Sequence, residues 1–162
     1  MSICSAEKMK LIEEVGLHFE AKANLTPLAA RIFAICLLSK EEGYSFDEFK
    51  EITQASKSSV STNLNLLLQL KYIEYYTKPG ERKRYYRNAP CNLRVSLQEE
   101  LSDLEKEISV VTKMNDFNKK HNPHKFKKDQ SVAKILIDHL KNTKESLKET
   151  IGKINEFETS YS

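Results

Sequence analysis

The fold is decided by residues 56–90, which read SKSSVSTNLNLLLQLKYIEYYTKPGERKRYYRNAP. The first half begins with Ser56, a typical helix N-cap, and continues with apolar residues at helical spacing. These apolar residues are Val60, Leu64, Leu67 and Leu68. The second half holds two runs rich in β-forming residues, 73–77 and 83–88, on either side of a Pro79-Gly80 turn. The sequence therefore predicts a helix followed by a β-hairpin.

Two helices are expected further upstream. Residues 6–23 carry apolar side chains at helical spacing, which predicts a helix even though Gly16 costs about 1 kcal/mol relative to Ala. The second helix should start at Thr26-Pro27, because Thr is a good N-cap and Pro is harmless at the first helical position. Its wide apolar stripe indicates a largely buried helix. Gly43 is expected at its C′ position, where a left-handed residue ends many helices.

A capping box predicts one more short helix. Ser45 stands three residues before Glu48, so each side chain can satisfy a backbone N–H near the other. This helix should run to about Ile52, and a brief connection should lead to Ser56. The order helix, helix, short turn, helix and hairpin is that of a winged helix-turn-helix, so we expect a mainly α fold with a small β-hairpin.

Two long helices are expected after the hairpin, at about 93–118 and 131–158, separated by a basic stretch at 119–128 that Pro123 interrupts. The first has one apolar face, formed by Leu97, Leu101, Leu104, Ile108 and Val111. The second carries Leu136, Leu140, Thr143, Leu147, Thr150, Ile154 and Phe157 at alternating spacings of four and three. This alternation indicates a coiled-coil-like seam.

Positive charge is concentrated in one part of the chain. The net charge of all 162 residues is +3, whereas residues 50–90 hold eight Lys and Arg against three Glu. Such asymmetry is typical of a nucleic-acid surface. With 40% hydrophobic and 30% charged residues, the composition is that of an ordinary globular protein and argues against wholesale disorder.

The cysteines and the apolar runs bear on the compartment. Cys4, Cys36 and Cys91 are odd in number and far apart, so we expect a reducing cytoplasm and no disulfide framework. No apolar run approaches the roughly 18 residues of a transmembrane helix, and the first residues lack a signal-peptide core, so neither membrane nor export is expected. We find no P-loop, dinucleotide fingerprint, nucleophile elbow or zinc-ligand cluster. Neither an enzyme nor a bound cofactor or metal is therefore expected.

The helix after Ser56 is expected to contact DNA, because its first turns are small, polar and able to form hydrogen bonds in a major groove. Its candidate residues are Lys57, Ser58, Ser59, Ser61, Thr62 and Asn65. Several Ser and Thr residues so close together would weaken a helix that met only water. The hairpin should bring basic side chains to the neighbouring backbone or minor groove. Its candidate residues are Lys78, Arg82, Lys83 and Arg84.

Residues 56–90, with LTPLAARIFAICLLS at 25–39, resemble the GbsR-type branch of the MarR superfamily of bacterial transcriptional regulators. The resemblance rests on a Ser-Lys-x-Ser-Val-Ser helix start and a Pro-Gly-Glu-Arg-Lys wing, and it covers about residues 10–95. The Asp-x-Arg wing and the Val-x-Leu-Thr that follows it in the broader superfamily are absent, which favours the narrower branch.

This resemblance implies a homodimer with interlocked terminal helices. Residues 1–25 and 91–162 would be its dimerisation helices, and residues 26–90 its winged DNA-binding domain. It also implies DNA contacts at Ser58, Ser59, Ser61, Thr62, Arg82 and Arg84. Two recognition helices would enter successive major grooves about 34 Å apart, on double-stranded DNA with a pseudo-palindromic operator. Such a regulator would act as a repressor, and an unidentified small-molecule effector is a further expectation.

Several alternatives stay open at this point. A winged helix can also serve as a protein-interaction adaptor without sequence-specific DNA binding. The basic stretch 119–128 could contact phosphate or be a solvated kink. His121 and His124 have the spacing of a metal pair, but no Cys or carboxylate cluster accompanies them. Cys4 could sense oxidation if its thiol were accessible and had a depressed pKa.

Overall fold

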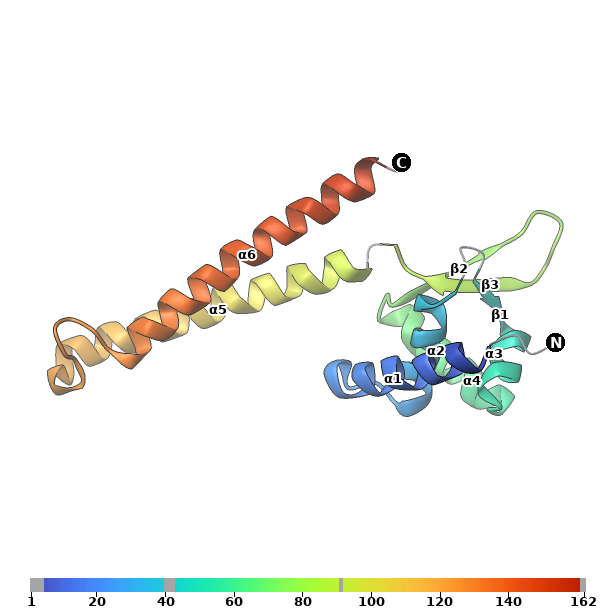
Figure 1. Ribbon diagram of the computed structural model, residues 1–162, viewed down its shortest axis with the longest axis horizontal. Helices are drawn as coiled ribbons and strands as arrows, with labels where there is room; N and C mark the ends of the chain where they lie inside the picture. The colour runs from blue at the N-terminus through green and yellow to red at the C-terminus, as the bar shows by residue number, and fades with distance from the viewer. Residues whose placement is uncertain (1–4, 40–42, 91, 161–162) are drawn as a thin grey trace. The chain divides into compact units, whose positions relative to one another are not determined.

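The computed structural model describes residues 5–39, 43–90 and 92–160, and the chain divides into two compact units between Asn92 and Leu93. Helices dominate both units, and the first also contains a three-stranded antiparallel sheet (Figure 1). The predicted mainly α fold with a small β-hairpin is therefore confirmed. Within the described ranges, no helix combines the length and apolar character needed to cross a membrane.

The first unit holds the helices and strands of the winged helix. Its helices are α1 (Ala6–Ala23), α2 (Pro27–Leu37), α3 (Phe46–Thr53) and α4 (Lys57–Gln69). Its strands are β1 (Tyr44–Ser45), β2 (Ile73–Thr77) and β3 (Arg84–Asn88), in the order β1-β3-β2. The hairpin is confirmed, with β3 starting one residue later than predicted because Lys83 still belongs to the loop.

The predicted helix starts are confirmed by their side-chain caps. Thr26 Oγ1 accepts a hydrogen bond from the backbone N–H of Ala29 at 3.2 Å, and Ser56 Oγ accepts one from the backbone N–H three residues on. Ser45 and Glu48 form the reciprocal capping box, in which Glu48 Oε2 accepts the Ser45 backbone N–H at 2.7 Å. These caps satisfy N–H groups that have no partner inside their own helix.

Gly43 is not the C′ residue of α2, so that prediction was wrong. The helix ends at Leu37 with Leu38 as its C-cap. Gly43 lies directly before β1, a strand that the sequence did not reveal, and has a φ of 64°. A Cβ at this position would collide with the carbonyl oxygen of Tyr86 on β3. The glycine therefore permits the close approach of β1 to β3 rather than ending a helix.

The core of the first unit is built around α2, which packs against α1, α3, α4 and β3. Its apolar side chains are almost wholly buried, as the apolar stripe predicted. The rings of Phe19, Phe33 and Tyr72 pack edge to face in series, with centroid separations of 4.8 Å at both contacts. This series joins α1 and the residue before β2 to the central helix.

Gly16 has a packing role that offsets its low helix propensity. It is buried where α1 meets α2, and a Cβ there would lie 3.0 Å from Cγ of Arg31. Arg31 in turn forms ion pairs with Glu13 at 2.8 Å and Glu20 at 3.6 Å, both on α1. A glycine thus lets an arginine stem lie across the helix and hold two carboxylates.

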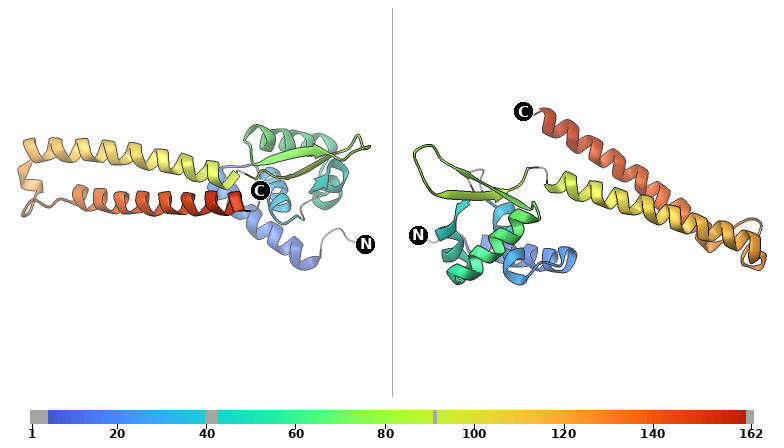
Figure 2. Two further views of the ribbon diagram at one scale, coloured as in Figure 1. Left: turned by 90° about the horizontal axis from the view of Figure 1, so that it is seen from above. Right: turned by 180° about the vertical axis from the view of Figure 1, so that it is seen from behind.

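The second unit is an antiparallel pair of long helices, α5 (Asn92–His121) and α6 (Val132–Ser160), which lie side by side (Figure 2). The turn between them contains the short 3-10 helix η1 (Pro123–Lys125). The five residues predicted for the apolar face of α5 are all half-buried. Lys144 Nζ lies 2.9 Å from Glu105 Oε1, and this ion pair joins the two helices.

The predicted seam of α6 is only partly the face that packs in this unit. Ile137, Leu140 and Ile151 are its buried residues, whereas Leu136 and Phe157 are 39% and 64% exposed. The residues of α6 that are not exposed include 137, 140, 144, 147, 151, 154 and 158, at alternating spacings of three and four. The packed face therefore also has a 3.5-residue period, and it shares Leu140, Leu147 and Ile154 with the predicted seam but is otherwise shifted by one residue.

Candidate nucleic-acid interface

The polar residues of α4 form one continuous stripe opposite its core face. The core face consists of Val60, Leu64 and Leu67, all buried. Ser58, Ser61, Thr62 and Asn65 follow the spacing i, i+3, i+4, i+7, and all four are exposed, as is Lys57. This spacing places them on one side of the helix. The helix thus presents hydroxyl, amide and ammonium groups on the surface that its core residues leave to solvent.

Ser59 differs from the other candidates, because it is half-buried and belongs to the cap of the helix. Its backbone N–H donates to Ser56 Oγ at 3.2 Å, and the two hydroxyl oxygens lie 2.8 Å apart. The Ser58 hydroxyl lies 3.1 Å from the same Ser56 oxygen. Three hydroxyls therefore gather at the N-terminus of α4, where the backbone N–H groups and the helix dipole favour negative charge.

Asn63 was missed by the sequence reasoning, and it connects two helix starts. Its Nδ2 donates to the carbonyl oxygen of Ser59 at 2.8 Å, and its Oδ1 accepts from Thr26 Oγ1 at 2.6 Å. Thr26 is the N-cap of α2, so the bond fixes the start of α2 against α4. The sequence could have indicated this residue only by its position, because Asn63 lies one turn after Ser59, on the side of the helix that faces α2.

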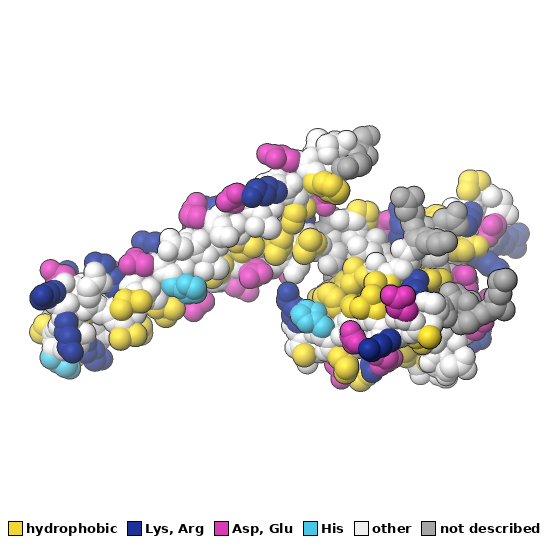
Figure 3. Space-filling model, in the orientation of Figure 1, with side chains coloured by type: hydrophobic (Ala, Val, Ile, Leu, Met, Phe, Trp, Pro, Cys, Tyr) yellow, Lys and Arg dark blue, Asp and Glu magenta, His cyan; other side chains and the backbone are white. Residues whose placement is uncertain are grey.

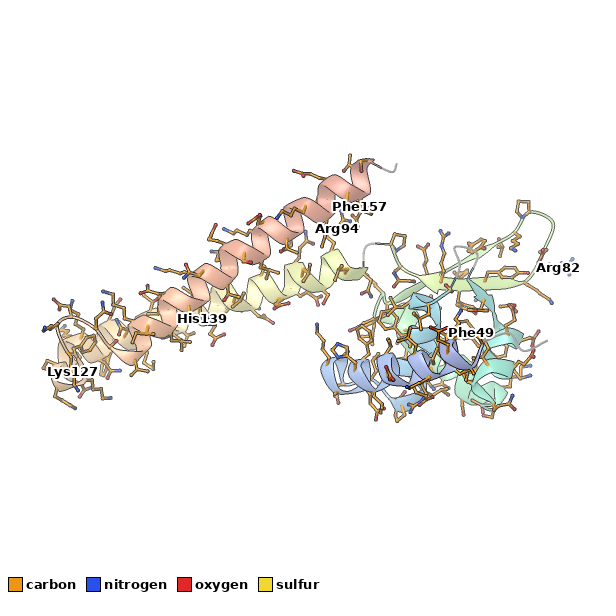
Figure 4. The ribbon with its side chains drawn as sticks, in the orientation of Figure 1. Phe49, Arg82, Arg94, Lys127, His139 and Phe157 are labelled. Carbon is orange, nitrogen blue, oxygen red and sulfur yellow. The ribbon has the colours of Figure 1, made fainter. Side chains whose placement is uncertain are left out.

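The wing is a regular antiparallel hairpin whose basic end lies beyond its paired residues. β2 and β3 pair from Ile73 with Asn88 to Thr77 with Arg84, and residues 78–83 form the loop. Arg82 lies at the outer end of the wing, away from the core around Phe49 (Figure 4). The structure brings Arg82 together with Lys83 and Arg84 as three consecutive exposed cations.

Tyrosine rings on the wing hold several of its cations in place. The Arg84 guanidinium carbon lies 4.4 Å from the centroid of the Tyr75 ring, and Lys78 Nζ lies 4.5 Å from that of Tyr85. The Tyr85 hydroxyl donates to Glu81 Oε2 at 2.7 Å, and this hydrogen bond to a carboxylate is the main cause of the raised Tyr85 pKa. These contacts reduce the freedom of side chains that would otherwise be mobile.

Arg87 has partners on the opposite strand of the wing. Its Nε lies 2.7 Å from Glu74 Oε1, and its guanidinium carbon lies 5.0 Å from the centroid of Tyr76. Glu74 is directly opposite Arg87 in the strand register. The pair is a cross-strand ion pair that stabilises the hairpin.

A cavity of about 250 Å³ separates the start of α3 from the wing. It is lined by Ser45, Phe46, Asp47, Arg82, Lys83, Arg84 and Tyr86. Three cations against one carboxylate give this cavity a positive excess that suits a phosphate group. Figure 3 shows Lys and Arg side chains at the wing end of the first unit. Phe46 and Asp47 were not among the predicted site residues, because their position beside the wing depends on the unpredicted β1–β3 pairing.

Among the residues that the structure describes, the other sequence candidates show no reactive or metal-binding arrangement. Cys36 is buried, and burial raises its pKa to about 12, so its thiol stays protonated and unreactive. Cys4 and Cys91 lie outside the described residues. The ring of His121 stacks on Phe117 with centroids 4.5 Å apart. Across residues 5–39, 43–90 and 92–160, no three His, Cys, Asp or Glu side chains gather as metal ligands would.

Comparisons with known proteins place this geometry in context. No protein-family model matches the chain. The chain is similar to the HTH-type transcriptional regulator MmpR5 of Mycobacterium tuberculosis (strain ATCC 25618 / H37Rv), with 34% identity over 82 residues. That match covers 51% of this chain and 49% of MmpR5, so the chain spans about half the length of this relative.

A solved crystal structure of a transcriptional regulator has a similar fold. The TM-score is 0.51 at 21% identity, and the match covers 96% of this chain and 97% of that one. At this identity the likeness concerns the fold. It extends over both units of the chain, including the two long helices as well as the winged helix.

Proposed function

We propose that this chain is a sequence-specific DNA-binding transcriptional regulator, of the GbsR-type branch of the MarR superfamily. One observation supports the proposal most: a single compact unit carries both the exposed polar stripe of α4 and the consecutive cations of the wing. These are the two surfaces that a winged helix applies to a duplex. Similarity to a regulator named HTH-type over half of the chain agrees with it.

In this proposal the stripe of α4 enters the major groove. Ser58, Ser61, Thr62 and Asn65 would form hydrogen bonds to base edges, and Lys57 would contact phosphate. Ser59 would act more through the N-terminus of the helix, because its hydroxyl lies against the Ser56 cap. The hydroxyls and the amide can both donate and accept, which is what the mixed edges of base pairs require.

The wing would contact the neighbouring backbone or minor groove. Arg82 and Lys83 are exposed in the loop, while Arg84 is oriented by the Tyr75 ring on which it lies. Because Arg84 is already held, its binding to an anion loses less side-chain entropy. Lys78 would support the loop from the ring of Tyr85. One DNA phosphate would fit the cavity between α3 and the wing.

The active form in this proposal is a homodimer on a pseudo-palindromic operator, acting in the cytoplasm as a repressor. Large apolar side chains remain exposed on the terminal helices, namely Met9, Leu11 and Leu17 on α1, Leu93, Val110 and Met114 on α5, and Ile135 and Leu136 on α6. Burial of such side chains stabilises an assembly by about 25 cal/mol per Å² of apolar surface. Regions 1–25 and 91–162 would thus form the dimer and 26–90 would bind DNA. A small-molecule effector would act by stabilising one arrangement of the dimer.

The proposal can be tested by selecting the duplexes that the protein binds from a random pool. Anisotropy titrations then compare the affinity for the selected duplexes with the affinity for random DNA. We expect a preferred pseudo-palindromic site, and light scattering should give a dimer that binds one duplex. The double variant Ser61→Ala/Thr62→Ala should lower the ratio of specific to random affinity, while the exposed control Ser102→Ala should not. Absence of binding to any duplex at low salt would overturn the proposal and favour a protein-interaction adaptor.

A further inference from the structure

A second cavity lies at the turn between α5 and α6, within the second unit. Its volume is about 300 Å³. Its lining residues are Asn115, Asn118, Lys125, Phe126, Ser131, Val132 and Ala133. The walls therefore come from three segments: the last turns of α5, the connecting turn and the first turn of α6. Sites for small organic ligands begin at about this volume.

Hydrogen bonds orient the polar side chains of this cavity. Ser131 Oγ donates to Asn115 Oδ1 at 2.6 Å. Asn118 Oδ1 accepts from Asn122 Nδ2 at 2.8 Å and from Lys125 Nζ at 3.3 Å. Asn118 Oδ1 accepts two hydrogen bonds and Asn115 Oδ1 accepts one, while each amide also carries an Nδ2 group with two donors. With the ammonium of Lys125, the donors of the cavity outnumber its remaining acceptors.

Positive charge surrounds the cavity. Residues 119–128 contain five Lys and no acidic residue, and Lys127 lies at the turn itself (Figure 4). The flanking acids are Asp116 and Asp129, and Asp129 Oδ1 is 3.4 Å from Lys119 Nζ. Figure 3 shows several Lys or Arg side chains over this end of the helix pair. A local excess of cations raises the concentration of anions near the cavity.

We infer that this cavity binds a small organic anion: a carboxylate joined to an apolar body. The donors of Lys125, Asn115 and Asn118 match the acceptor-only carboxylate, and the charge-assisted bond to Lys125 is the strongest of these contacts. Phe126, Val132 and Ala133 supply the apolar wall for the rest of the ligand. The volume limits the occupant to a small molecule.

Such a ligand contacts all three segments and holds the ends of α5 and α6 against their turn. The first-unit surfaces assigned to DNA contribute nothing to this cavity. The inference therefore does not rest on the proposed function, and its test requires no DNA.

Octanoate is a suitable probe, and octanol, which has the same chain length but no charge, is its control. In amide NMR spectra of the full chain, octanoate should shift residues 115–133 and saturate, whereas octanol should bind at least about tenfold more weakly. Lys125→Gln should weaken octanoate binding by about tenfold or more, as expected when a charge-assisted hydrogen bond is lost. The control Lys148→Gln changes an exposed lysine elsewhere on α6 and should leave the affinity unchanged.

A substitution that fills the cavity supplies a second line of evidence. Ala133→Phe should abolish the octanoate shifts at 115–133 while the spectrum of the first unit stays that of the parent protein. The inference is overturned if octanol binds as well as octanoate, or if Lys125→Gln and Lys148→Gln behave alike. It is also overturned if the shifts map outside 115–133, which would indicate adsorption on exposed apolar side chains.

Discussion

Arg82→Ala provides the sharpest test of the proposed contact between the wing and DNA, because the same hairpin contains a matched control. Arg82 is exposed at the outer end of the loop. Arg87 carries the same charge, but its guanidinium group is engaged by Glu74 at 2.7 Å and by the ring of Tyr76. Alanine at either position removes one positive charge. We expect only Arg82→Ala to weaken DNA binding.

The expected size of the effect follows from counterion release. Each phosphate contact contributes about 0.9 to the slope of log K against log salt on B-DNA. The proposed dimer would carry two wings, so Arg82→Ala should reduce the slope by about 1.8. If the variant and the parent protein bind equally at 1 M salt, this difference in slope lowers the affinity of the variant by about 30-fold at about 0.15 M salt.

Anisotropy titrations of a labelled duplex at several salt concentrations between about 50 and 200 mM measure this slope. The loss for Arg82→Ala should be similar on every sequence, since a phosphate contact carries no base information. Equal slopes for Arg82→Ala and Arg87→Ala would refute the assignment. A loss confined to one operator sequence would instead make Arg82 a base-contacting residue.

Three further predictions follow from the first unit. Gly43→Ala should lower the free energy of unfolding in urea by about 1–3 kcal/mol, because its left-handed backbone and the Tyr86 carbonyl both oppose a Cβ. The Cys36 thiol, with a pKa of about 12, should resist a disulfide reagent at pH 8 until the protein unfolds. The hydrogen bond of Tyr85 to Glu81 raises the Tyr85 pKa above its ordinary value of 10. The stabilisation of the fold by this hydrogen bond is therefore complete below pH 10, and it is lost as the pH rises through the folded-state pKa of Tyr85. Ultraviolet titration should show a late ionisation that Glu81→Gln removes.

The helix starts of the first unit could be predicted from the sequence because they are local. Thr26, Ser45 and Ser56 each accept a hydrogen bond from an N–H only three residues away, so a short pattern contains the whole interaction. Gly43 is different. Its conformation serves a strand that pairs with Tyr85 and Tyr86, about forty residues further along. A left-handed glycine fits both a helix end and a strand entry, and only the distant partner distinguishes them.

The seam of α6 shows a related limit. Its spacing correctly predicts an amphipathic helix, but an amphipathic face does not identify its partner. The structure places Ile137, Leu140 and Ile151 against α5 and leaves Leu136 exposed. Under the proposed dimer, the exposed flank would be used between subunits. One helix would then divide its apolar residues between an internal contact and an intermolecular one.

The wing shows what residue types alone leave undecided at a site. Its sequence predicts many cations and tyrosines in a hairpin, but the register decides which of them meet. Tyr75 lies under Arg84, Tyr85 under Lys78, and the Arg87 guanidinium is held by Glu74 on the opposite strand. Arg82 and Lys83 lie in the loop, beyond the paired strands, and both are exposed. Under the proposed function, Arg82 and Lys83 would contact DNA from the loop and Arg84 from its place on the Tyr75 ring, while the Arg87–Glu74 pair would chiefly keep the hairpin rigid enough to present them.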